Sequence, residues 1–268
     1  MYHYSIYQWL FFFYIYCFIG WCIESTYVSV RVKKATNRGF MRGPWLPIYG
    51  SGAIVMLFCA GPFMKYPPLV FLAGMIGASV LEFFTGEAME ALFKVRYWDY
   101  SDRKFNLKGQ ICLLNSFYWG ILTIVMNYFV HNHIEKLVMA FNWKLLEIVT
   151  ILWSIAILVD FSMSFKAAMD MREVLIQLDK AKREMHKIQK RLDVLIAVAT
   201  DEVKDELDEL KIRHAIIRER VAGLSNNRDF FLRTIIKGNP TMVSKRFTEA
   251  LDTLKQAITS KNIGDGDD

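Results

Sequence analysis

Several hallmarks of soluble nucleotide-binding and metal-binding proteins are missing from this 268-residue sequence. It has no GxxxxGK[ST] stretch, the loop that cradles the phosphates of ATP in many ATPases. His131 and His133 have no cluster of acids or cysteines beside them, and the cysteines lack metal-ligand spacing. We therefore expect no metal and no cofactor. The four cysteines lie in apolar runs, and we interpret them as small packing residues: Cys17, Cys22, Cys59 and Cys112.

The sequence also lacks a basic stretch interleaved with stacking aromatic residues, so nucleic acid is not expected as a partner. Its net charge is +6, yet residues 166–268 hold 20 lysines and arginines against 18 acids. What it has in excess is apolar: 53% of the residues are hydrophobic and 15% are aromatic. This share exceeds that of a typical soluble domain and indicates a membrane protein.

Five apolar segments are long enough to cross a bilayer, for which a helix needs about 20 residues. The expected fold class is therefore all-α: a polytopic helical membrane protein with about five transmembrane helices and a cytoplasmic helical tail. The N-terminal stretch MYHYSIYQWL lacks a basic region and a cleavage site, so it is not interpreted as a signal peptide. The expected spans are 5–31, 46–64, 67–93, 110–130 and 144–165.

The distribution of basic residues predicts the orientation in the membrane. Two of the predicted loops carry ten lysines and arginines, and the opposite side carries three. Basic loops tend to stay on the cytoplasmic side. We therefore predict a multi-pass protein of the cell membrane with its N-terminus outside and its tail in the cytoplasm.

The tail shows helical patterns. Apolar residues from Met171 to Ala199 follow alternating steps of three and four, and the pattern resumes from Val203 after a stutter. Because residues 166–222 contain no glycine or proline, one long helix is favoured, with a hairpin broken near Thr200 as the alternative. Burying the seam against a second copy predicts a homo-oligomer. The domains expected are 1–165 (membrane), 166–225 (coiled coil) and 226–268.

The last domain is expected to be one amphipathic helix and a disordered end. Gly238 is suited to end a preceding helix and Pro240 to open the next. Val243, Phe247, Leu251, Leu254 and Ile258 mark the apolar face of that final helix. The closing residues GDGDD have no apolar side chain to bury.

Charged residues within or beside the spans mark the candidate site, since each buried charge is costly in a bilayer. Carboxylates of the first and third spans fall in the cytoplasmic halves, where basic loops supply guanidinium groups. A structural ion-pair network and a polar cavity for a substrate both remain open as interpretations. The candidate substrate-binding residues are Glu24, Asn37, Arg38, Tyr49, Glu82, Glu87, Arg96, Trp98, Asp99, Tyr100 and Asn106.

A series of motifs gives the chain a family resemblance. It comprises GWCIES (20–25), NRGFMRGPWLPIYG (37–50), LEFFTGEAMEALF (81–93), RYWDYS (96–101), NLKGQICL (106–113) and SFYWG (116–120). In order and spacing the series resembles the CmpB-type family named "putative ABC-transporter type IV". The tail stretch NPTMVSKRFTEALDTLK is similar to a segment of longer members.

The resemblance implies a transporter permease component, a membrane subunit that couples to an ATPase on a separate polypeptide. Two other classes stay open from the residues alone. An intramembrane lipid-modifying or phospholipid-binding enzyme would use the same arginines and carboxylates around a phosphorylated head group. A membrane scaffold or sensor would act through its coiled coil.

Overall fold

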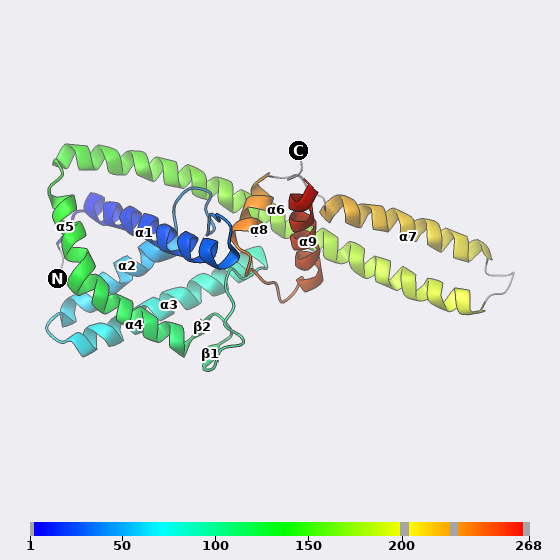
Figure 1. Cartoon of the computed structure of the whole chain (residues 1–268), viewed down its shortest axis with the longest axis horizontal. Helices are drawn as coiled ribbons and strands as arrows, with labels where there is room; N and C mark the ends of the chain where they lie inside the picture. Colours follow the sequence, from blue (N-terminus) through cyan, green and yellow to red (C-terminus); the bar gives the residue numbers. More distant parts are fainter. Residues whose placement is uncertain (1–2, 199–203, 226–229, 265–268) are drawn as a thin grey trace.

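The computed structural model describes residues 3–198, 204–225 and 230–264, and most of them are helical (Figure 1). The predicted all-α class is confirmed. Within the described part of the chain, the named strands form a single two-residue antiparallel hairpin, β1 (Asn106–Leu107) with β2 (Ile111–Cys112). This hairpin directly precedes helix α4 (Leu113–Val125).

Among the residues that the structure describes, four helices are long and apolar enough to cross a membrane. They are α1 (Ile6–Val32), α3 (Pro67–Phe93), the continuous segment Leu113–Met139, and the first part of α6 (Trp143–Val198). The Leu113–Met139 segment comprises α4, a π-helical turn (Met126–Val130) and α5 (His131–Met139). The second predicted span corresponds to α2 (Pro47–Ala60) and a 3-10 turn (Gly61–Phe63), which are apolar but shorter. The chain is thus a helical membrane protein.

Local sequence accounts for where these helices begin. The Ser5 side chain accepts a hydrogen bond from Gln8 N (3.3 Å), and the Gln8 side chain accepts one from Ser5 N (2.9 Å). This reciprocal pair caps the first turn of α1. Pro47 and Pro67 open α2 and α3, where the missing N–H of proline costs nothing.

Close contacts between small residues and aromatic rings hold the spans together. A Cβ atom added at Gly20 of α1 would lie 2.3 Å from the Cβ of Tyr49 on α2. Only glycine at position 20 lets α1 and α2 approach this closely, and the Tyr49 side chain packs directly against it. Phe12, Met56 and Leu57 are fully buried between the spans.

The outer face of α6 is apolar and uncovered. Large side chains along it are more than 40% exposed: Ile148, Ile151, Leu152, Ile155, Leu158 and Val159. Such a continuous apolar surface suits contact with lipid tails rather than water.

Helix α6 continues past the membrane segment and forms a hairpin with α7 (Lys204–Ser225), so the prediction of one long helix over the tail is wrong. Arg191 pairs with Glu206, and Arg213 pairs with Glu184 at 2.9 Å. The two ion pairs are seven residues apart on each helix, and the numbering decreases on α6 while it increases on α7. This is the spacing of two antiparallel helices that pack with a heptad repeat. The predicted break near Thr200 falls on residues 199–203, outside the described ones.

The hairpin buries much of the apolar seam inside the chain. Ala181, Ile188 and Leu192 of α6 pack with Ile217 of α7. Nothing in the amino-acid pattern distinguishes this from packing against a second copy, which is why the sequence left both open. The homo-oligomer remains a prediction, but the seam no longer supplies the argument for it.

Two further helices pack back on α6. Helix α8 (Phe230–Gly238) ends at Gly238, but α9 (Thr248–Gly264) begins eight residues after Pro240, so the prediction that Pro240 opens it is wrong. Directly before α9, Ser244 Oγ accepts a hydrogen bond from Phe247 N at 3.0 Å, as a side chain at a helix start does. Residues 265–268 of the predicted disordered end lie outside the described part.

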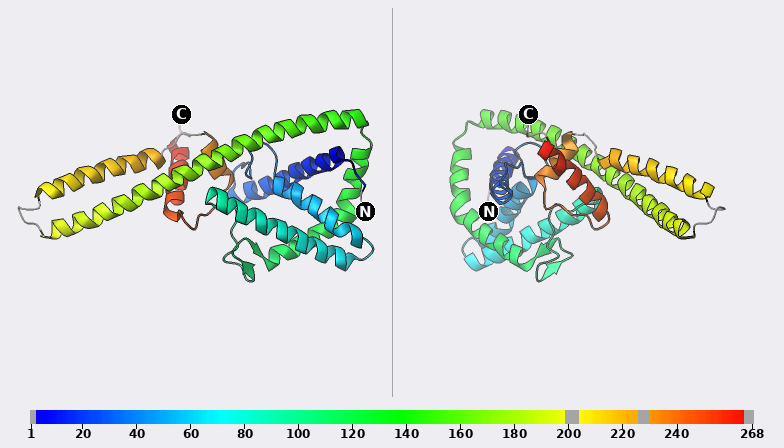
Figure 2. Two further views of the ribbon diagram at one scale, coloured as in Figure 1. Left: turned by 180° about the vertical axis from the view of Figure 1, so that it is seen from behind. Right: turned by 45° about the vertical axis from the view of Figure 1, so that its right-hand side comes forward.

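The C-terminal segment joins the membrane part through one core. Phe93, Val95 and Tyr97 pack with residues of α6, α8 and α9 and with Met242 of the segment between α8 and α9; the helix residues include Leu175, Leu232, Leu251 and Leu254. Arg96 and Val243 exchange backbone hydrogen bonds of 2.7 and 3.0 Å. The loops between α1 and α2 and after α3 therefore lie at the tail end of the molecule, and the N-terminus lies at the opposite end (Figures 1 and 2).

Helix α6 crosses residue 165 without a break, and the three-domain division stays a prediction.

Candidate functional site

A cavity of about 710 Å³ lies where the membrane helices meet the tail. Its walls come from α1, α2, α3, α4 and α6, from the loops that follow α1 and α3, and from Asn239 just after α8. Its volume falls within the range of pockets that hold small molecules. Among the described residues, three charged side chains line it: Glu24, Arg38 and Glu82.

Arg38 and Glu24 form an ion pair in this cavity. Arg38 Nε lies 3.9 Å from Glu24 Oε2, and the Tyr49 hydroxyl donates to Glu24 Oε1 at 2.7 Å. Arg38 also donates to Asn239 Oδ1 (2.5 Å) and to the Tyr97 carbonyl (3.2 Å). Burial lowers the pKa of Arg38, and the charge of Glu24 opposes that shift. The guanidinium is thus held from three sides.

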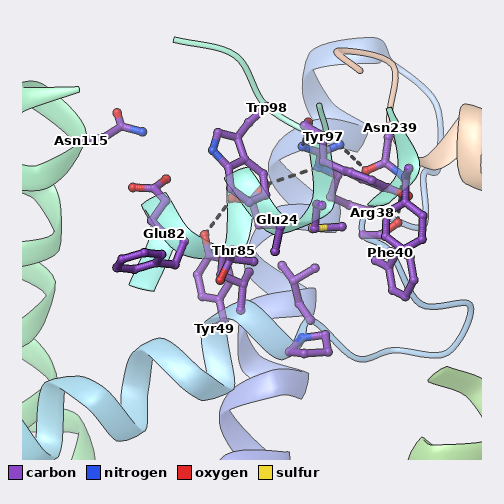
Figure 3. A pocket seen from close by; sticks show the side chains of 18 of the residues that line it. Glu24, Arg38, Phe40, Tyr49, Glu82, Thr85, Tyr97, Trp98, Asn115 and Asn239 are labelled. Atoms are coloured by element: carbon purple, nitrogen blue, oxygen red, sulfur yellow. Dashed lines mark hydrogen bonds and ion pairs between the residues drawn. The ribbon is translucent and has the colours of Figure 1, made fainter. Parts of the chain in front are cut away.

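Glu82 has a different environment. It is 5% exposed and accepts hydrogen bonds from the Tyr100 hydroxyl (3.2 Å) and from Trp119 Nε1 (2.9 Å). Both donors are neutral, and none of the residues that the structure describes forms an ion pair with it. In Figure 3, Glu82 lies to one side with Asn115, and Arg38 lies to the other with Asn239. One end of the site therefore holds the ion pair of Arg38 and Glu24. The other end holds the Glu82 carboxyl group, which has no ion-pair partner among the described residues.

Much of the remaining wall is apolar, and part of it faces outward. Five large lining side chains are each at least 37% exposed: Phe84, Leu92, Tyr118, Leu122 and Phe161. They belong to helices that are long and apolar enough to cross a membrane, so the cavity wall extends to the exposed apolar surface of those helices.

Tyr97 contributes a buried hydroxyl group to the wall of the cavity. Tyr97 is 4% exposed, and its hydroxyl oxygen forms no hydrogen bond with any described residue. Burial raises the pKa of Tyr97, against a smaller opposing effect of the Arg38 charge. A buried hydroxyl without a partner is uncommon in folded proteins.

The loop after α1 is held in place by an acid of α6. Asp160 accepts hydrogen bonds from Gly43 N (2.8 Å) and Arg42 N (3.3 Å). Asn37 accepts from Trp21 Nε1 (2.5 Å) and donates to the Arg42 carbonyl (2.6 Å). These bonds fix the loop that carries Arg38 into the cavity.

The loop after α3 is organised around Arg96. Its Nε lies 2.6 Å from Glu90 Oε2 and its Nη1 lies 3.2 Å from Asp99 Oδ1. Burial raises the pKa of Asp99, but hydrogen bonds from Ser101 and the charge of Arg96 outweigh it, and the pKa lies below its ordinary value. Trp98 Nε1 donates to the Gln110 carbonyl at 2.9 Å. This loop thereby presents Trp98 and Tyr100 to the cavity.

The structure brings six of the eleven predicted site residues to the cavity: Glu24, Arg38, Tyr49, Glu82, Trp98 and Tyr100. The other five do not line it. Asn37, Arg96 and Asp99 support the loops, Asn106 accepts from Gly109 N at 3.0 Å within the β1–β2 region, and Glu87 pairs with Lys108 at 3.0 Å. Glu82 and Glu87 lie five positions apart on a helix, so they point to different faces.

Three residues of this region were missed from sequence. Asp160 is an acid inside the predicted span 144–165, and by the cost of buried charge it belonged among the candidates. Trp119 stands in the SFYWG motif, but nothing in a single sequence pairs it with Glu82. Asn239 precedes Pro240 in the tail, and no periodicity connects it with Arg38.

A second buried polar cluster lies at the other end of the spans. His131 is fully buried, and its ring nitrogens lie 3.1 and 2.8 Å from the hydroxyls of Tyr4 and Tyr16. Tyr4 also donates to Glu135 at 2.6 Å. The π-helical turn directly precedes His131.

Comparison with known families identifies the chain's relatives. Residues 11–165 match the family model described as "Putative ABC-transporter type IV", which covers more than half of the 268 residues. The chain belongs to this family. The match contains every residue of the cavity wall apart from Asn239. Neither the comparison with curated proteins nor the comparison with solved structures returned a match.

Proposed function

We propose that this chain is the membrane-embedded permease component of a transporter, and that its ligand binds in the cavity between the spans and the tail. The observation that carries the proposal is the make-up of that cavity: charged and hydrogen-bonding groups at the level of the loops, joined to apolar walls that reach the lipid-covered surface. Such a cavity accepts a ligand from the bilayer and holds its polar part.

The energy source would be a second polypeptide. The family carries the name of ABC transporters, which couple to ATP hydrolysis, and this sequence contains no GxxxxGK[ST] loop. The tail hairpin and the helices packed at its base supply the part of the chain that such a partner would contact.

Filling the cavity tests the proposal. Ala88 lines the cavity from α3, and Ala88→Phe adds a ring there without changing charge. The variant is placed in cells from which the gene has been deleted, beside the wild type. Retention of radiolabelled amphiphiles, cationic, anionic and uncharged, is then measured. We expect the wild type to change the retention of at least one compound relative to the deletion, and Ala88→Phe to behave as the deletion.

Ala91→Phe is the matched control, because Ala91 is an exposed alanine on the same helix that does not line the cavity. It should behave as the wild type, with equal amounts of each protein in the membrane. Equal retention of every compound in all four strains would overturn the proposal, and so would full activity of Ala88→Phe.

A further inference from the structure

We infer that the ligand of this cavity is a cationic amphiphile, an alkylammonium-type head on an apolar chain, with its cation beside Glu82. This inference names the ligand class and rests on the proposed function. It is carried by the charge around Glu82, by the aromatic rings beside it and by the apolar opening.

The charge balance of the cavity favours a cation. Glu24 and Glu82 contribute two negative charges and Arg38 contributes one positive charge, so the wall carries a formal charge of −1. Arg38 lies 3.9 Å from Glu24 and is further held by Asn239, so no cationic side chain among the described residues forms an ion pair with Glu82. A buried carboxylate needs a cation or a proton, and a positively charged ligand head satisfies it.

Aromatic side chains donate hydrogen bonds to the same carboxyl groups. Tyr49 and Trp119 both line the cavity, with ring centroids 6.1 Å apart and planes at 61°. Each ring uses its polar edge atom on a glutamate: Tyr49 on Glu24 and Trp119 on Glu82. Trp98 uses its Nε1 on the Gln110 carbonyl. The π faces of such rings attract ammonium groups, and quaternary ammonium ligands are bound in this way.

The apolar chain of the ligand would lie along the exposed apolar side chains at the opening of the cavity. Phe84 is 66% exposed and Tyr118 is 57% exposed, and both line the cavity from neighbouring helices α3 and α4. An alkyl chain in the bilayer would contact these side chains while its head lies beside Glu82. A hydrophilic cation would gain nothing from this opening.

Equilibrium dialysis against protein in nanodiscs of neutral lipid tests the inference, with empty nanodiscs subtracted. The probes are radiolabelled dodecyltrimethylammonium and dodecyl sulfate, which share a chain and differ in charge. We expect the wild type to bind the cation above background, and Glu82→Gln to bind it about tenfold more weakly. Ala88→Phe, which keeps the charge and fills the space, should weaken binding as well.

Glu87→Gln is the matched control, because Glu87 is a carboxylate of the same helix that pairs with Lys108 outside the cavity. It should bind the cation as the wild type does. Cation binding that is unchanged in Glu82→Gln and in Ala88→Phe overturns the inference, as does the absence of binding to the wild type.

The two proposals can fail separately. If dodecyl sulfate binds and Ala88→Phe prevents it, the cavity is a ligand site and the cationic class is wrong. If neither probe binds in a way that depends on Ala88, the cationic inference falls, and the cell assay alone decides on the transport function.

Discussion

Arg38, Glu24 and Glu82 line one cavity, but the contacts divide them unequally. Arg38 lies 3.9 Å from Glu24, with side chains 14% and 30% exposed. Glu82 takes its hydrogen bonds from Tyr100 and Trp119 instead. From sequence, the acids of the first and third spans and the arginines of the basic loops were expected to form an ion-pair network or a polar cavity. The geometry favours one coupled pair and one carboxyl group that stands apart.

A double-mutant cycle measures this division. Arg38→Gln should lower the free energy of unfolding by about 1–3 kcal/mol, because it leaves the Glu24 charge without its partner. The double variant with Glu24→Gln should recover part of that loss, whereas Glu82→Gln should add to Arg38→Gln independently. Denaturant titration in mixed micelles gives the values. Coupling of Arg38 to Glu82 as strong as to Glu24 would contradict this arrangement.

Burial cost is a residue-scale rule, and from sequence it pointed to two of the carboxyl groups that line the cavity. Glu24 and Glu82 were found because a charge in an apolar span needs a reason. The partners of those charges were less accessible. Trp119 is 37 residues from Glu82, and Asn239 is 201 residues from Arg38. Such pairs follow from how helices meet in space, which a single sequence does not encode in any local pattern.

At the scale of elements, the spans were easier to predict than the tail. An apolar segment long enough to cross a bilayer is stable there as a spanning helix, because a helix satisfies its own backbone hydrogen bonds. The predicted span 67–93 agrees with α3. The seam of the tail has several solutions, since a second helix can come from the same chain or from another. The absence of glycine and proline favoured one long helix. Burial of Ile188 and Leu192 against Ile217 instead accompanies the reversal of the chain.

The hairpin register can be tested by cross-linking. With the four native cysteines replaced by alanine, Arg191→Cys and Glu206→Cys should be joined by a short bismaleimide within one chain, because these side chains form an ion pair. The product should run as a monomer on denaturing gels, and mass spectrometry should find the linked peptide. Arg191→Cys with Arg213→Cys is the control and should react less, since Arg213 pairs with Glu184. A dimeric product would show that α7 packs on another copy.

At the scale of the whole molecule, the tail is fastened to the loops of one membrane face. Asn239 donates to the Gly39 carbonyl at 2.8 Å, and Ser244 Oγ donates to the Lys94 carbonyl at 2.6 Å. Both basic loops are therefore held at the tail end. The basic bias of these loops leads us to propose that this end is cytoplasmic and that the protein resides in the cell membrane.

Cysteine labelling determines the orientation. Tyr66 follows the short turn after α2 and is 62% exposed, and Arg103 is exposed in the loop after α3. In a cysteine-free background, a membrane-impermeant maleimide should label Tyr66→Cys in intact cells. It should label Arg103→Cys only when the cells have been permeabilised. The reverse pattern would place the tail outside and overturn the proposed orientation.

The hydrogen bond between Arg38 and Asn239 has a consequence for biosynthesis. Translation completes every span before it reaches residue 239, so the membrane helices can enter the bilayer while the cavity wall is still open at Arg38. A ribosome that stops after α7 would release a chain with all its membrane helices and an unfinished cavity. The contact between Arg38 and Asn239 can therefore form only after the C-terminal segment has been synthesised.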